Sequence, residues 1–380
     1  MNKDGKTSNS AVSRRNLIKG AVAAGGAAAT LAASGNLGFN IRTAKAAGTT
    51  WKIQCSWAAG VLGYKIFEQW ANEMAERSGG ELIWKPFPAD AVVGTFQMMD
   101  ATKTGVLDAM NWWTLYGAGK LPVTVFLSSY PLGPRTEGEW DVFFYGLGGI
   151  ELTREVYAQQ GLYYLGPIHH GPNIIHSKVP IRSIDDFKGR KMRVPGGMVA
   201  ELYTAAGAKT TLLPGSEIFP AMEKGTIDVA DYVGPGINYE FGLHQVAKYI
   251  SMGPPGQMSI YQPVDVMDLT VNMGRWNALS KKMKELVEDE VDRYSRVHFA
   301  AIQKFDQDSW PKYEAAGVQV TRLSQRDVEE FTKLAVPLWF KWANKDKYAA
   351  RAFKIQLDYM MSGSLGYVTK SMIKGQTLKL

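Results

Sequence analysis

The 380-residue chain has a single cysteine, Cys55, and this scarcity excludes several kinds of site. A lone cysteine cannot form an internal disulfide, a thiol pair or a multi-cysteine metal centre. Only five histidines are present, and none stands in an H-E-x-x-H pattern or a similar ligand set. A metal centre built on cysteine or histidine is therefore not expected. Cys55, in a predicted first strand, is expected to be a small buried apolar residue.

Motifs of the common enzyme classes are also missing. The sequence contains no G-x-S-x-G nucleophile elbow, no P-loop and no protein-kinase signature. The pair Gly148-Gly149 lacks the spacing and the strand-helix context of a dinucleotide-binding loop. Nothing here points to covalent catalysis, and we expect neither enzymatic activity nor catalytic residues.

Most of the chain lacks an excess of basic charge, although the formal net charge is +7. Seven of the lysines and arginines precede residue 47, where the only acidic residue is Asp4. The remainder is close to neutral, so no nucleic-acid-binding surface is implied.

The basic leader has the three parts of an export signal. Residues 13–19 (Ser-Arg-Arg-Asn-Leu-Ile-Lys) precede a weakly apolar Ala/Gly-rich run over residues 21–33 and a small-residue site, Ala44-Lys45-Ala46. The arginine pair is typical of twin-arginine export. An uncleaved membrane anchor is the alternative, but the glycine content and low hydrophobicity make the run a poor span. We expect residues 1–46 to be a signal cleaved near Ala46, and the mature protein to reach the periplasm.

Two later stretches alternate between predicted strands and helices. In the first, strands over 51–56, 82–87 and 107–111 enclose helices over 62–77 and 95–104. In the second, strands over 191–194, 209–213 and 227–233 enclose helices over 198–206 and 217–224, the latter with Ser216 as its cap. Such alternation predicts a parallel sheet covered on both faces, and the repeat suggests two similar lobes.

The other segments are predicted to join these lobes. Residues 162–165 and 173–177 are extended, residues 277–305 form one long helix, and further helices begin at residues 325 and 348. Several crossings between lobes suggest a hinge. The predicted division places residues 47–168 and 257–298 in lobe I, and residues 169–256 and 299–380 in lobe II.

Arg193 is the first candidate for a binding role. It ends a short predicted strand directly before Pro195-Gly196-Gly197, where the backbone breaks and a cleft can open. Ligands of α/β sheets bind outside the carboxyl ends of the strands. An arginine offers a planar fork of donors that matches a carboxylate. On pattern alone, a surface arginine comparable to Lys191 is an equally good interpretation.

Other candidates also follow strands. Asp231 and Tyr232 end a predicted strand, and Gln262 lies farther along; their hard oxygen atoms suit Na⁺ or Ca²⁺, although exposed Asp and Gln are common. Rings at strand ends can wall a ligand cleft, with ordinary core packing as the alternative for each ring. The rings in question are Trp57, after the first strand, and Trp112, Trp113 and Tyr116, in a loop predicted over residues 112–117.

Three blocks of sequence carry a family resemblance. Residues 186–195, D-F-K-G-R-K-M-R-V-P, resemble the pattern D-L-K-G-L-K-M-R-V-P, with Phe187 and Arg190 in place of leucines. Residues 214–235 resemble P-x-x-E-I-[YF]…G-x-I-D…E-W-[VI]-G-P, and residues 145–149 are Y-G-L-G-G. In these blocks the chain resembles the substrate-binding receptors of tripartite ATP-independent periplasmic (TRAP) transporters, in particular the branch that binds 2-oxo and 2-hydroxy acids.

The resemblance covers essentially the whole mature chain and implies a fold and residue roles. The fold is α/β and periplasmic-binding-protein-like, with two lobes, a long lobe-spanning helix and a helical C-terminus. Arg193 matches the carboxylate-binding arginine of the family. Asp231, Tyr232 and Gln262 stand where the oxo-acid branch holds a bridging cation, with Asp231 replacing Glu and Tyr232 replacing Trp. Trp113 and Tyr116 lie where aromatic residues of the family contact the substrate, and Tyr232 is a further substrate-binding candidate. The family has a Gln near the start of the second lobe that is not evident here, and Asn173 is the nearest amide.

We therefore predict an exported receptor that captures a small 2-oxo or 2-hydroxy monocarboxylate and presents it to the membrane subunits of a TRAP transporter. A bridging Na⁺ or Ca²⁺ is expected, without a catalytic cofactor. Two alternatives stay open: an exported cofactor-dependent oxidoreductase, and the same receptor fold binding a larger or aromatic carboxylate. Paired receptors occur in this branch, and the helices over residues 324–361 are the expected interface of a homodimer.

Overall fold

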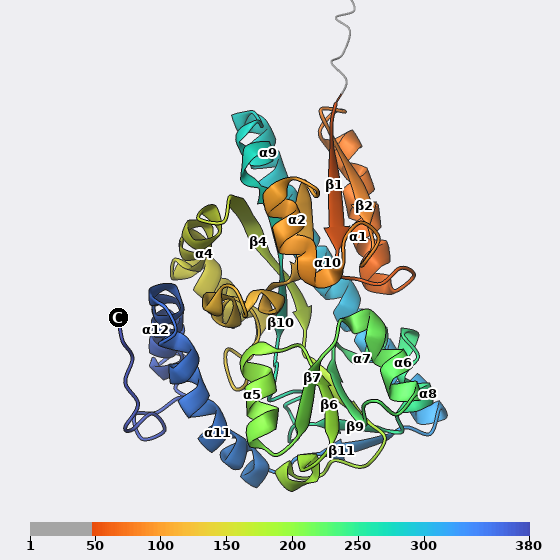
Figure 1. The fold of residues 1–380 in the computed structure, drawn as a ribbon, viewed down its shortest axis with the longest axis vertical. Helices are drawn as coiled ribbons and strands as arrows, with labels where there is room; N and C mark the ends of the chain where they lie inside the picture. The colour runs from red at the N-terminus through yellow and green to blue at the C-terminus, as the bar shows by residue number, and fades with distance from the viewer. Residues whose placement is uncertain (1–47) are drawn as a thin grey trace, which may run out of the picture. The chain divides into compact units, whose positions relative to one another are not determined.

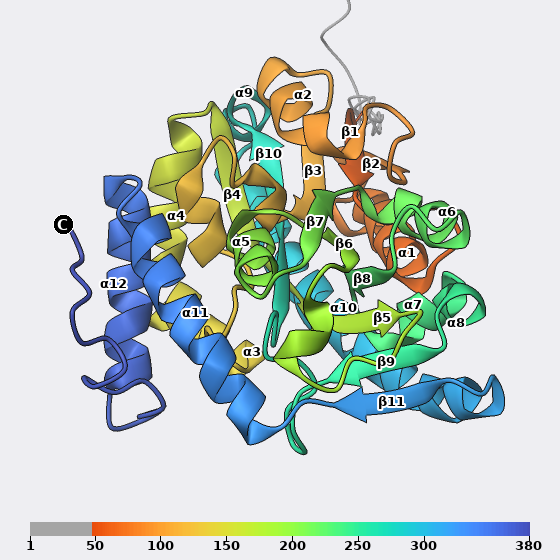
Figure 2. The same cartoon turned by 60° about the horizontal axis from the view of Figure 1, so that its bottom comes forward.

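The computed structural model describes residues 48–380, so the predicted export signal lies outside the described residues. Two mixed β-sheets organise this part of the chain, and helices pack around them (Figure 1). Figure 2 shows the same elements turned by 60°. No helix among residues 48–380 combines the length and the apolar character needed to cross a membrane.

The first sheet has the strand order β2-β1-β3-β10-β4. Its strands are β1 (Thr49–Cys55), β2 (Leu82–Phe87), β3 (Ala109–Trp113), β4 (Leu162–Gly171) and β10 (Asp265–Asn272). The helices that pack on this sheet are α1 (Leu62–Arg77), α2 (Met98–Thr104) and α4 (Gly149–Ala158). Helix α1 buries Phe67, Trp70, Ala71 and Met74, which repeat at the spacing of one helical face. Cys55 is buried, as expected.

The second sheet has the order β11-β9-β5-β8-β6-β7. Its strands are β5 (Ile174–Ser177), β6 (Lys191–Val194), β7 (Lys209–Leu212), β8 (Val229–Tyr232), β9 (Tyr249–Met252) and β11 (Gln319–Arg322). The helices that follow these strands include α5 (Gly197–Ala205), α6 (Ile218–Glu223), α7 (Pro235–Glu240) and α8 (Leu243–Val246). We call the first sheet with its helices lobe I and the second lobe II.

The two-lobed fold agrees with the prediction, but neither sheet is purely parallel. In lobe I, β10 runs antiparallel to both β3 and β4; in lobe II, β5 runs antiparallel to both β8 and β9. The parallel pairs are those that the strand-helix alternation predicts, such as β1 with β3 and β6 with β8. Strands β10 and β5 begin where the chain crosses between the sheets, so they enter in the reversed direction.

Helix α10 (Lys281–Ala315) packs against both lobes. Its 35 residues correspond to a length of about 50 Å. The sequence predicts a helix from residue 277 to 305, whereas the observed helix starts later, after the short α9 (Met273–Asn277), and continues through Pro311. The long lobe-spanning helix that the resemblance implies is therefore present.

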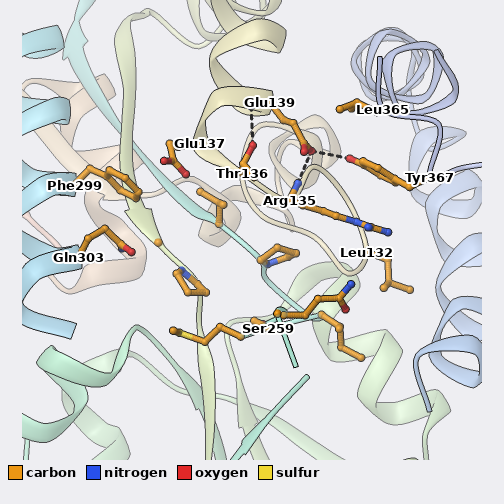
Figure 3. Close-up of a pocket in the computed structure, with 18 of the residues that line it drawn as sticks. Leu132, Arg135, Thr136, Glu137, Glu139, Ser259, Phe299, Gln303, Leu365 and Tyr367 are labelled. Atoms are coloured by element: carbon orange, nitrogen blue, oxygen red, sulfur yellow. Dashed lines mark hydrogen bonds between the residues drawn. The ribbon is translucent and has the colours of Figure 1, made fainter. Parts of the chain in front are cut away.

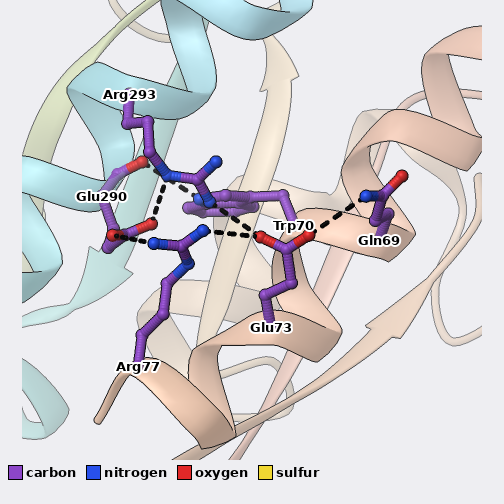
Figure 4. A network of polar contacts seen from close by, with 6 residues as sticks. All are labelled: Gln69, Trp70, Glu73, Arg77, Glu290 and Arg293. Carbon is purple, nitrogen blue, oxygen red and sulfur yellow. Dashed lines mark hydrogen bonds and ion pairs between the residues drawn. The ribbon is translucent and has the colours of Figure 1, made fainter.

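A network of charged side chains joins α10 to α1 in lobe I (Figure 4). Arg77 of α1 donates to Glu73 (3.0 Å) and to Glu290 of α10 (3.2 Å). Arg293 of α10 donates to the same two carboxylates, at 3.0 and 2.8 Å, and the Trp70 indole N–H donates to the Glu290 carbonyl at 3.0 Å. The first part of α10 is thus fixed to lobe I.

The second part of α10 is fixed to lobe II. The Asp306 carboxylate accepts a 2.7 Å hydrogen bond from the backbone N–H of Gly236 in α7, and the Tyr313 hydroxyl donates to the Pro235 carbonyl at 2.9 Å. A movement of one lobe relative to the other must therefore be absorbed between Arg293 and Asp306, or in the β4–β5 and β9–β10 crossings.

The last two helices contact both lobes. Helix α11 (Gln325–Ala343) starts with a capping box between Ser324 and Asp327 and packs on α5 of lobe II. Helix α12 (Lys347–Met361) packs on α4 and on the 3₁₀ turn η3 (Pro122–Phe126) of lobe I. Strand β4 also continues in the first sheet to Gly171, beyond the predicted lobe boundary at residue 168. The predicted limits of the two lobes stay a prediction.

Candidate ligand-binding site

A small cavity lies between the lobes, where β3 of lobe I and β6 and β8 of lobe II end. Its lining residues are Trp113, Leu115, Tyr116, Asn173, Arg193, Pro195, Tyr232, Val233, Gln262 and Asp265. The space open to the centre of a water-sized sphere is about 10 Å³, roughly the room of one water molecule. Every residue predicted to bind substrate lines this cavity, and so does Gln262; Asp231 does not.

Arg193 is buried, with 1% of its surface exposed, so it is not a surface arginine comparable to Lys191. Its Nε donates to the Leu213 carbonyl at 2.9 Å, and Nη1 donates to the Asp231 backbone carbonyl at 2.6 Å. Nη2 lies 3.4 Å from the Tyr116 hydroxyl. Three of its five N–H donors are thus used, and within residues 48–380 no carboxylate forms an ion pair with it. A buried arginine without a counterion favours an anionic ligand.

Asn173 joins two of the polar residues at the hinge. Its Nδ2 donates to Asp231 Oδ1 at 3.3 Å and to Gln262 Oε1 at 3.1 Å. Asn173 lies in the β4–β5 crossing and Gln262 in the β9–β10 crossing, so both side chains sit where the lobes meet. The hydrogen bond between Asn173 and Gln262 thus brings two side-chain amides together in the cavity that Arg193 also lines.

Asp231 is fully buried on β8, between β5 and β6. Its Oδ2 has no hydrogen-bond partner among the described residues. Burial raises the pKa of Asp231 to about 7, opposed by the Arg193 charge and assisted by the Asp265 charge. Asp231 therefore either holds a proton or, when ionised, needs a cation that compensates its charge.

Asp265 is a site residue that the sequence reasoning missed. It is the first residue of β10, is 5% exposed and lines the cavity. Its Oδ1 accepts from the Ser128 hydroxyl (3.2 Å) and from the Val266 N–H (3.0 Å). Burial raises its pKa to about 7 as well. An acidic residue at the start of a strand that is buried along almost its whole length, three positions after Gln262, was the available signal.

The aromatic candidates divide into cavity walls and core residues. Trp113 and Tyr116 wall the cavity from lobe I, while Trp57 packs behind Trp113 with ring centroids 5.1 Å apart. Trp112 donates its indole N–H to Asp268 at 3.0 Å, inside lobe I. Trp57 and Trp112 are therefore core residues, the alternative left open for each ring.

The prediction that Trp112 and Trp113 lie in a loop is wrong. Both belong to β3, where they pair with Asp268 and Met267 of β10. This antiparallel partner, far away in the sequence, extends the strand past its predicted end. Neighbouring strand residues point to opposite faces, so only one of the two rings reaches the cavity.

Polar contacts between residues outside the cavity lining also join the lobes. Glu240 at the end of α7 accepts a 2.6 Å hydrogen bond from the backbone N–H of Leu62, the first residue of α1. Its other oxygen pairs with Lys65 at 2.9 Å. We call these three residues the lobe clasp. Because α1 has no side-chain cap of its own, Glu240 supplies one from the opposite lobe.

A second contact between the lobes involves Ser216. The predicted cap of Ser216 on the helix that follows is not formed; its hydroxyl donates instead to Asp90 of lobe I at 3.1 Å. Asp90 has a φ of 63°, in the left-handed region, and its other oxygen accepts from the Thr95 N–H at 2.8 Å. The loop whose Leu213 carbonyl accepts a hydrogen bond from Arg193 therefore also contacts lobe I.

A larger pocket, of about 510 Å³, lies at the hinge between the β4–β5 crossing, α10 and the C-terminal segment (Figure 3). Two of its charged residues, Glu139 and Arg135, contact neutral groups. The Glu139 carboxylate accepts from the Arg135 backbone N–H at 2.6 Å and from the Tyr367 hydroxyl at 2.8 Å, and the Arg135 guanidinium stacks on the Tyr367 ring at 3.9 Å. None of the predicted site residues lines this pocket.

The polar groups in and around the small cavity are suited to binding a charged ligand. The cavity offers a buried guanidinium, two carboxylates nearby and amide oxygens. Within residues 48–380 no group of three or more His, Cys, Asp or Glu side chains is arranged to hold a metal ion. A hard cation held here would therefore depend on amide or backbone oxygens and on those of a ligand.

Comparison with known proteins identifies the family. Residues 55–346 match the model of the bacterial extracellular solute-binding protein family 7. The chain belongs to this family. The predicted resemblance to TRAP receptors is thus confirmed, and solute binding is favoured over an exported oxidoreductase.

Individual relatives are similar over most of their length. The monocarboxylate 2-oxoacid-binding periplasmic protein of Nostoc sp. is 26% identical over 297 residues, which are 78% of this chain and 80% of the relative. The TRAP solute-binding protein of Colwellia psychrerythraea, solved with calcium and pyruvate, has a TM-score of 0.75 at 24% identity, covering 82% and 94% of the two chains. That of Pseudoalteromonas atlantica, solved with sodium and pyruvate, has a TM-score of 0.74 at 22% identity, covering 84% and 98%. These structural likenesses establish the shared fold.

Proposed function

We propose that the chain is the extracytoplasmic solute receptor of a TRAP transporter and binds a small 2-oxo or 2-hydroxy monocarboxylate. The observation that carries this proposal is Arg193, buried between the lobes without a carboxylate partner among residues 48–380. Family membership and the monocarboxylate 2-oxoacid-binding relative support the same ligand class.

The carboxylate of the acid would accept hydrogen bonds from the unused N–H groups of Arg193. Hydrogen bonds to a charged group contribute about 1.5–3 kcal/mol each. The cavity as observed has room for roughly one water, so even a three-carbon acid requires the lobes to separate first. Binding and closure are therefore coupled, and the ligand favours the closed state by contacting both lobes.

The size of the cavity favours a small acid over a larger or aromatic one. Trp113 and Tyr116 already close the space from lobe I. A larger acid would have to keep the lobes farther apart, at the expense of the lobe clasp and the Ser216–Asp90 contact. The alternative of an aromatic carboxylate is less consistent with these contacts.

A cation, Na⁺ or Ca²⁺, would bridge the ligand to the receptor. The resemblance assigns it to Asp231, Tyr232 and Gln262, and the oxygen-rich surroundings suit a hard cation because Asp231 has an oxygen without a partner. When bound, the cation supplies positive charge that offsets the buried carboxylates. Asn173, Trp113, Tyr116 and Tyr232 would orient the acid on Arg193.

The finer biological context belongs to the same proposal. A twin-arginine signal cleaved near Ala46 would deliver the receptor to the periplasm, where the closed form would engage the membrane subunits of the transporter. A homodimer through residues 324–361 would have to use the outer faces of the helices. The inner face of α12 already buries Phe353, Leu357 and Met360 within its own chain.

Calorimetric titration of the metal-stripped mature protein tests the proposal. The panel comprises pyruvate, lactate, longer 2-oxo acids and benzoate, each with Ca²⁺, with Na⁺ and with neither. We expect micromolar or tighter binding of a small 2-oxo or 2-hydroxy acid. Binding of benzoate alone would support the larger-ligand alternative, and no binding of any acid would contradict the proposed function.

A further inference from the structure

We call the larger pocket of Figure 3 the hinge pocket, because each segment that can absorb a movement between the lobes lines it. The β4–β5 crossing contributes Pro172, and the β9–β10 crossing contributes Pro263. Helix α10 contributes Phe299 and Gln303, which lie between the contacts that fix this helix to lobe I and those that fix it to lobe II. A movement of the lobes therefore changes the shape of the hinge pocket.

The hinge pocket and the small cavity lie on opposite sides of the two crossings and share no lining residue. Pro172 lines the pocket, whereas the next residue, Asn173, lines the cavity. In the same way, Pro263 lines the pocket and Gln262 lines the cavity. Neighbouring side chains of an extended chain point to opposite sides, and the Asn173 N–H donates to the Gln262 carbonyl at 3.1 Å. The two hydrogen-bonded crossings therefore form the wall between the pocket and the cavity.

The hinge pocket is large enough for a small molecule while the lobes are closed. Its volume of about 510 Å³ lies within the range of roughly 300–1,000 Å³ that is common for small-molecule sites. The small cavity in the same structure has room for about one water molecule. A ligand that fits the hinge pocket in this arrangement loses contacts when the walls of the pocket move. Such a ligand binds the closed protein more tightly than the open one and therefore favours closure.

Two side chains of opposite charge line the hinge pocket without forming an ion pair among the described residues. The Arg135 guanidinium stacks on the Tyr367 ring at 3.9 Å, and only the backbone N–H of Arg135 donates a hydrogen bond to a described residue. Glu137, the first residue of α3 (Glu137–Asp141), is half-buried, and its carboxylate accepts no hydrogen bond from the described residues. The Glu139 carboxylate, by contrast, already accepts from Arg135 and Tyr367. Figure 3 shows the Glu137 carboxylate apart from the Arg135 guanidinium.

Much of the remaining lining of the hinge pocket is apolar. The large apolar side chains in it are Leu132, Ile260, Val264, Phe299 and Leu365. A ligand that matches this lining has a carboxylate for the free guanidinium, an ammonium group for the free carboxylate, and an apolar body for the walls. An amino acid or a short peptide with apolar side chains has this chemistry.

We propose that the hinge pocket binds a zwitterion with an apolar body, and that this second ligand stabilises the closed arrangement of the lobes. Arg135 holds the carboxylate of the zwitterion, and Glu137 holds its ammonium group. Binding in the pocket does not depend on the proposed function, whereas the effect on acid affinity rests on it. Because coupling between two sites is reciprocal, the acid and the zwitterion raise each other's affinity by the same factor.

Calorimetric titration of the mature protein with L-phenylalanine and with the dipeptide leucyl-phenylalanine, without any acid ligand, tests binding in the pocket. The tighter of the two shows whether the site takes an amino acid or a peptide. N-acetyl-phenylalanine, which lacks the ammonium group, and phenethylamine, which lacks the carboxylate, are the ligand controls. We expect a zwitterion to bind and both controls to bind much more weakly. Binding of neither zwitterion at millimolar concentration overturns the proposal, and equal binding of a control overturns the assigned ligand class.

Variants locate the zwitterion. Arg135→Gln and Glu137→Gln each remove one charge from a side chain that is not fully buried, so both variants should fold, as circular dichroism can establish. Each should weaken zwitterion binding at least about fivefold. Arg182→Gln, which changes an exposed arginine outside the pocket, and Arg193→Ala, which alters the small cavity, should still bind the zwitterion. Binding that Arg193→Ala loses and Arg135→Gln retains would place the zwitterion in the small cavity and overturn the proposal.

Repeating the acid titration at a saturating concentration of the zwitterion measures the coupling. The Kd for the acid should fall at least about fivefold, the lower end of common coupling between sites. Arg135→Gln and Glu137→Gln should remove this shift and leave the Kd for the acid alone unchanged. A Kd that stays constant or rises in the wild-type protein overturns the effect on closure. If no acid binds at all, the proposed function fails together with the coupling, whereas the pocket is judged by the zwitterion binding measured without acid.

Discussion

Arg193 and Tyr116 meet across the cleft, with Nη2 of the arginine 3.4 Å from the tyrosine hydroxyl. Arg193 belongs to β6 of lobe II, and Tyr116 belongs to the 3₁₀ turn η2 (Thr114–Gly117) of lobe I. The residue that would hold the acid is therefore also a contact between the lobes. Ligand binding and lobe closure share this pair.

Removing the hydroxyl tests that contact. Tyr116→Phe keeps the ring that walls the cavity and deletes one hydrogen bond, whose net contribution is about 0.5–1.5 kcal/mol. We expect the Kd for the acid to rise by roughly 2- to 12-fold, measured by calorimetry. An unchanged Kd would show that the hydroxyl contributes nothing to the closed, ligand-bound state.

The lobe clasp should govern how long the ligand stays bound. Glu240→Gln removes the ion pair with the exposed Lys65 and weakens the bond to the Leu62 N–H. The exposed ion pair contributes little, but the charged cap on α1 adds to it, so we expect a loss of about 1 kcal/mol in closure. The dissociation rate of the acid should rise about fivefold in stopped-flow measurements.

A matched control for the clasp is available within α10. Asp308→Asn removes an exposed ion pair with Lys304 inside α10, so it removes no ion pair between the lobes. This variant should leave the dissociation rate unchanged. Equal effects of Asp308→Asn and Glu240→Gln would contradict the role of the clasp.

Gly215 lies against Tyr232, so a larger residue at position 215 would move the Tyr232 side chain. A methyl group at Gly215 would come within 2.5 Å of the Tyr232 hydroxyl. Gly215→Ala should therefore displace the tyrosine and lower acid affinity about tenfold, an estimate based on the 1–3 kcal/mol cost of overpacking, with the protein still folded. Gly119→Ala, where a methyl group meets open space, is the control. Normal affinity in Gly215→Ala would show that Tyr232 does not position the ligand.

The two buried carboxyl groups make the stability of the metal-free protein depend on pH. The pKa of both Asp231 and Asp265 is raised from an ordinary value of 3.8 to about 7. Between these values the folded state holds protons that the unfolded state has released, so stability falls as pH rises from about 4 to above 7. Ca²⁺ should restore the melting temperature more at pH 8 than at pH 5.5.

Comparing the melting temperature of the wild-type protein with that of Asp265→Asn separates the contribution of Asp265 to this pH dependence from that of other groups. The wild-type protein should lose melting temperature relative to the variant as pH rises through 7 without Ca²⁺. A difference that is constant with pH, or that grows in favour of the wild type, would contradict a buried ionisable Asp265.

The parts of the site that local sequence encodes could be predicted. Arg193 follows from a short strand that stops at a proline and two glycines, because the end of a strand in an α/β lobe is where ligands bind. Its role as carboxylate ligand came from the resemblance. Its burial, which removes the surface alternative, depends on the Leu213 and Asp231 carbonyls and required the structure.

The parts of the site that depend on distant segments of the chain could not be predicted from the sequence. Asp265 lines the cavity because the β9–β10 crossing returns the chain to lobe I beside β4, and Ser216 reaches Asp90 because the lobes face each other. Trp112 and Trp113 join β3 because β10 pairs with it. Such long-range pairings leave no periodic signal in the segments themselves, so local patterns gave a cap for Ser216 and a loop for the two tryptophans.

The most direct test of the central claim is titration of Arg193→Ala with the acid and Ca²⁺, beside Arg182→Ala, which removes an exposed arginine of the same lobe. Loss of the charged hydrogen bonds should weaken acid binding by at least about 100-fold, while Arg182→Ala binds as the wild type does and both variants remain folded. Binding of the acid by Arg193→Ala at wild-type affinity would contradict Arg193 as the carboxylate-binding residue and, with it, this account of the receptor.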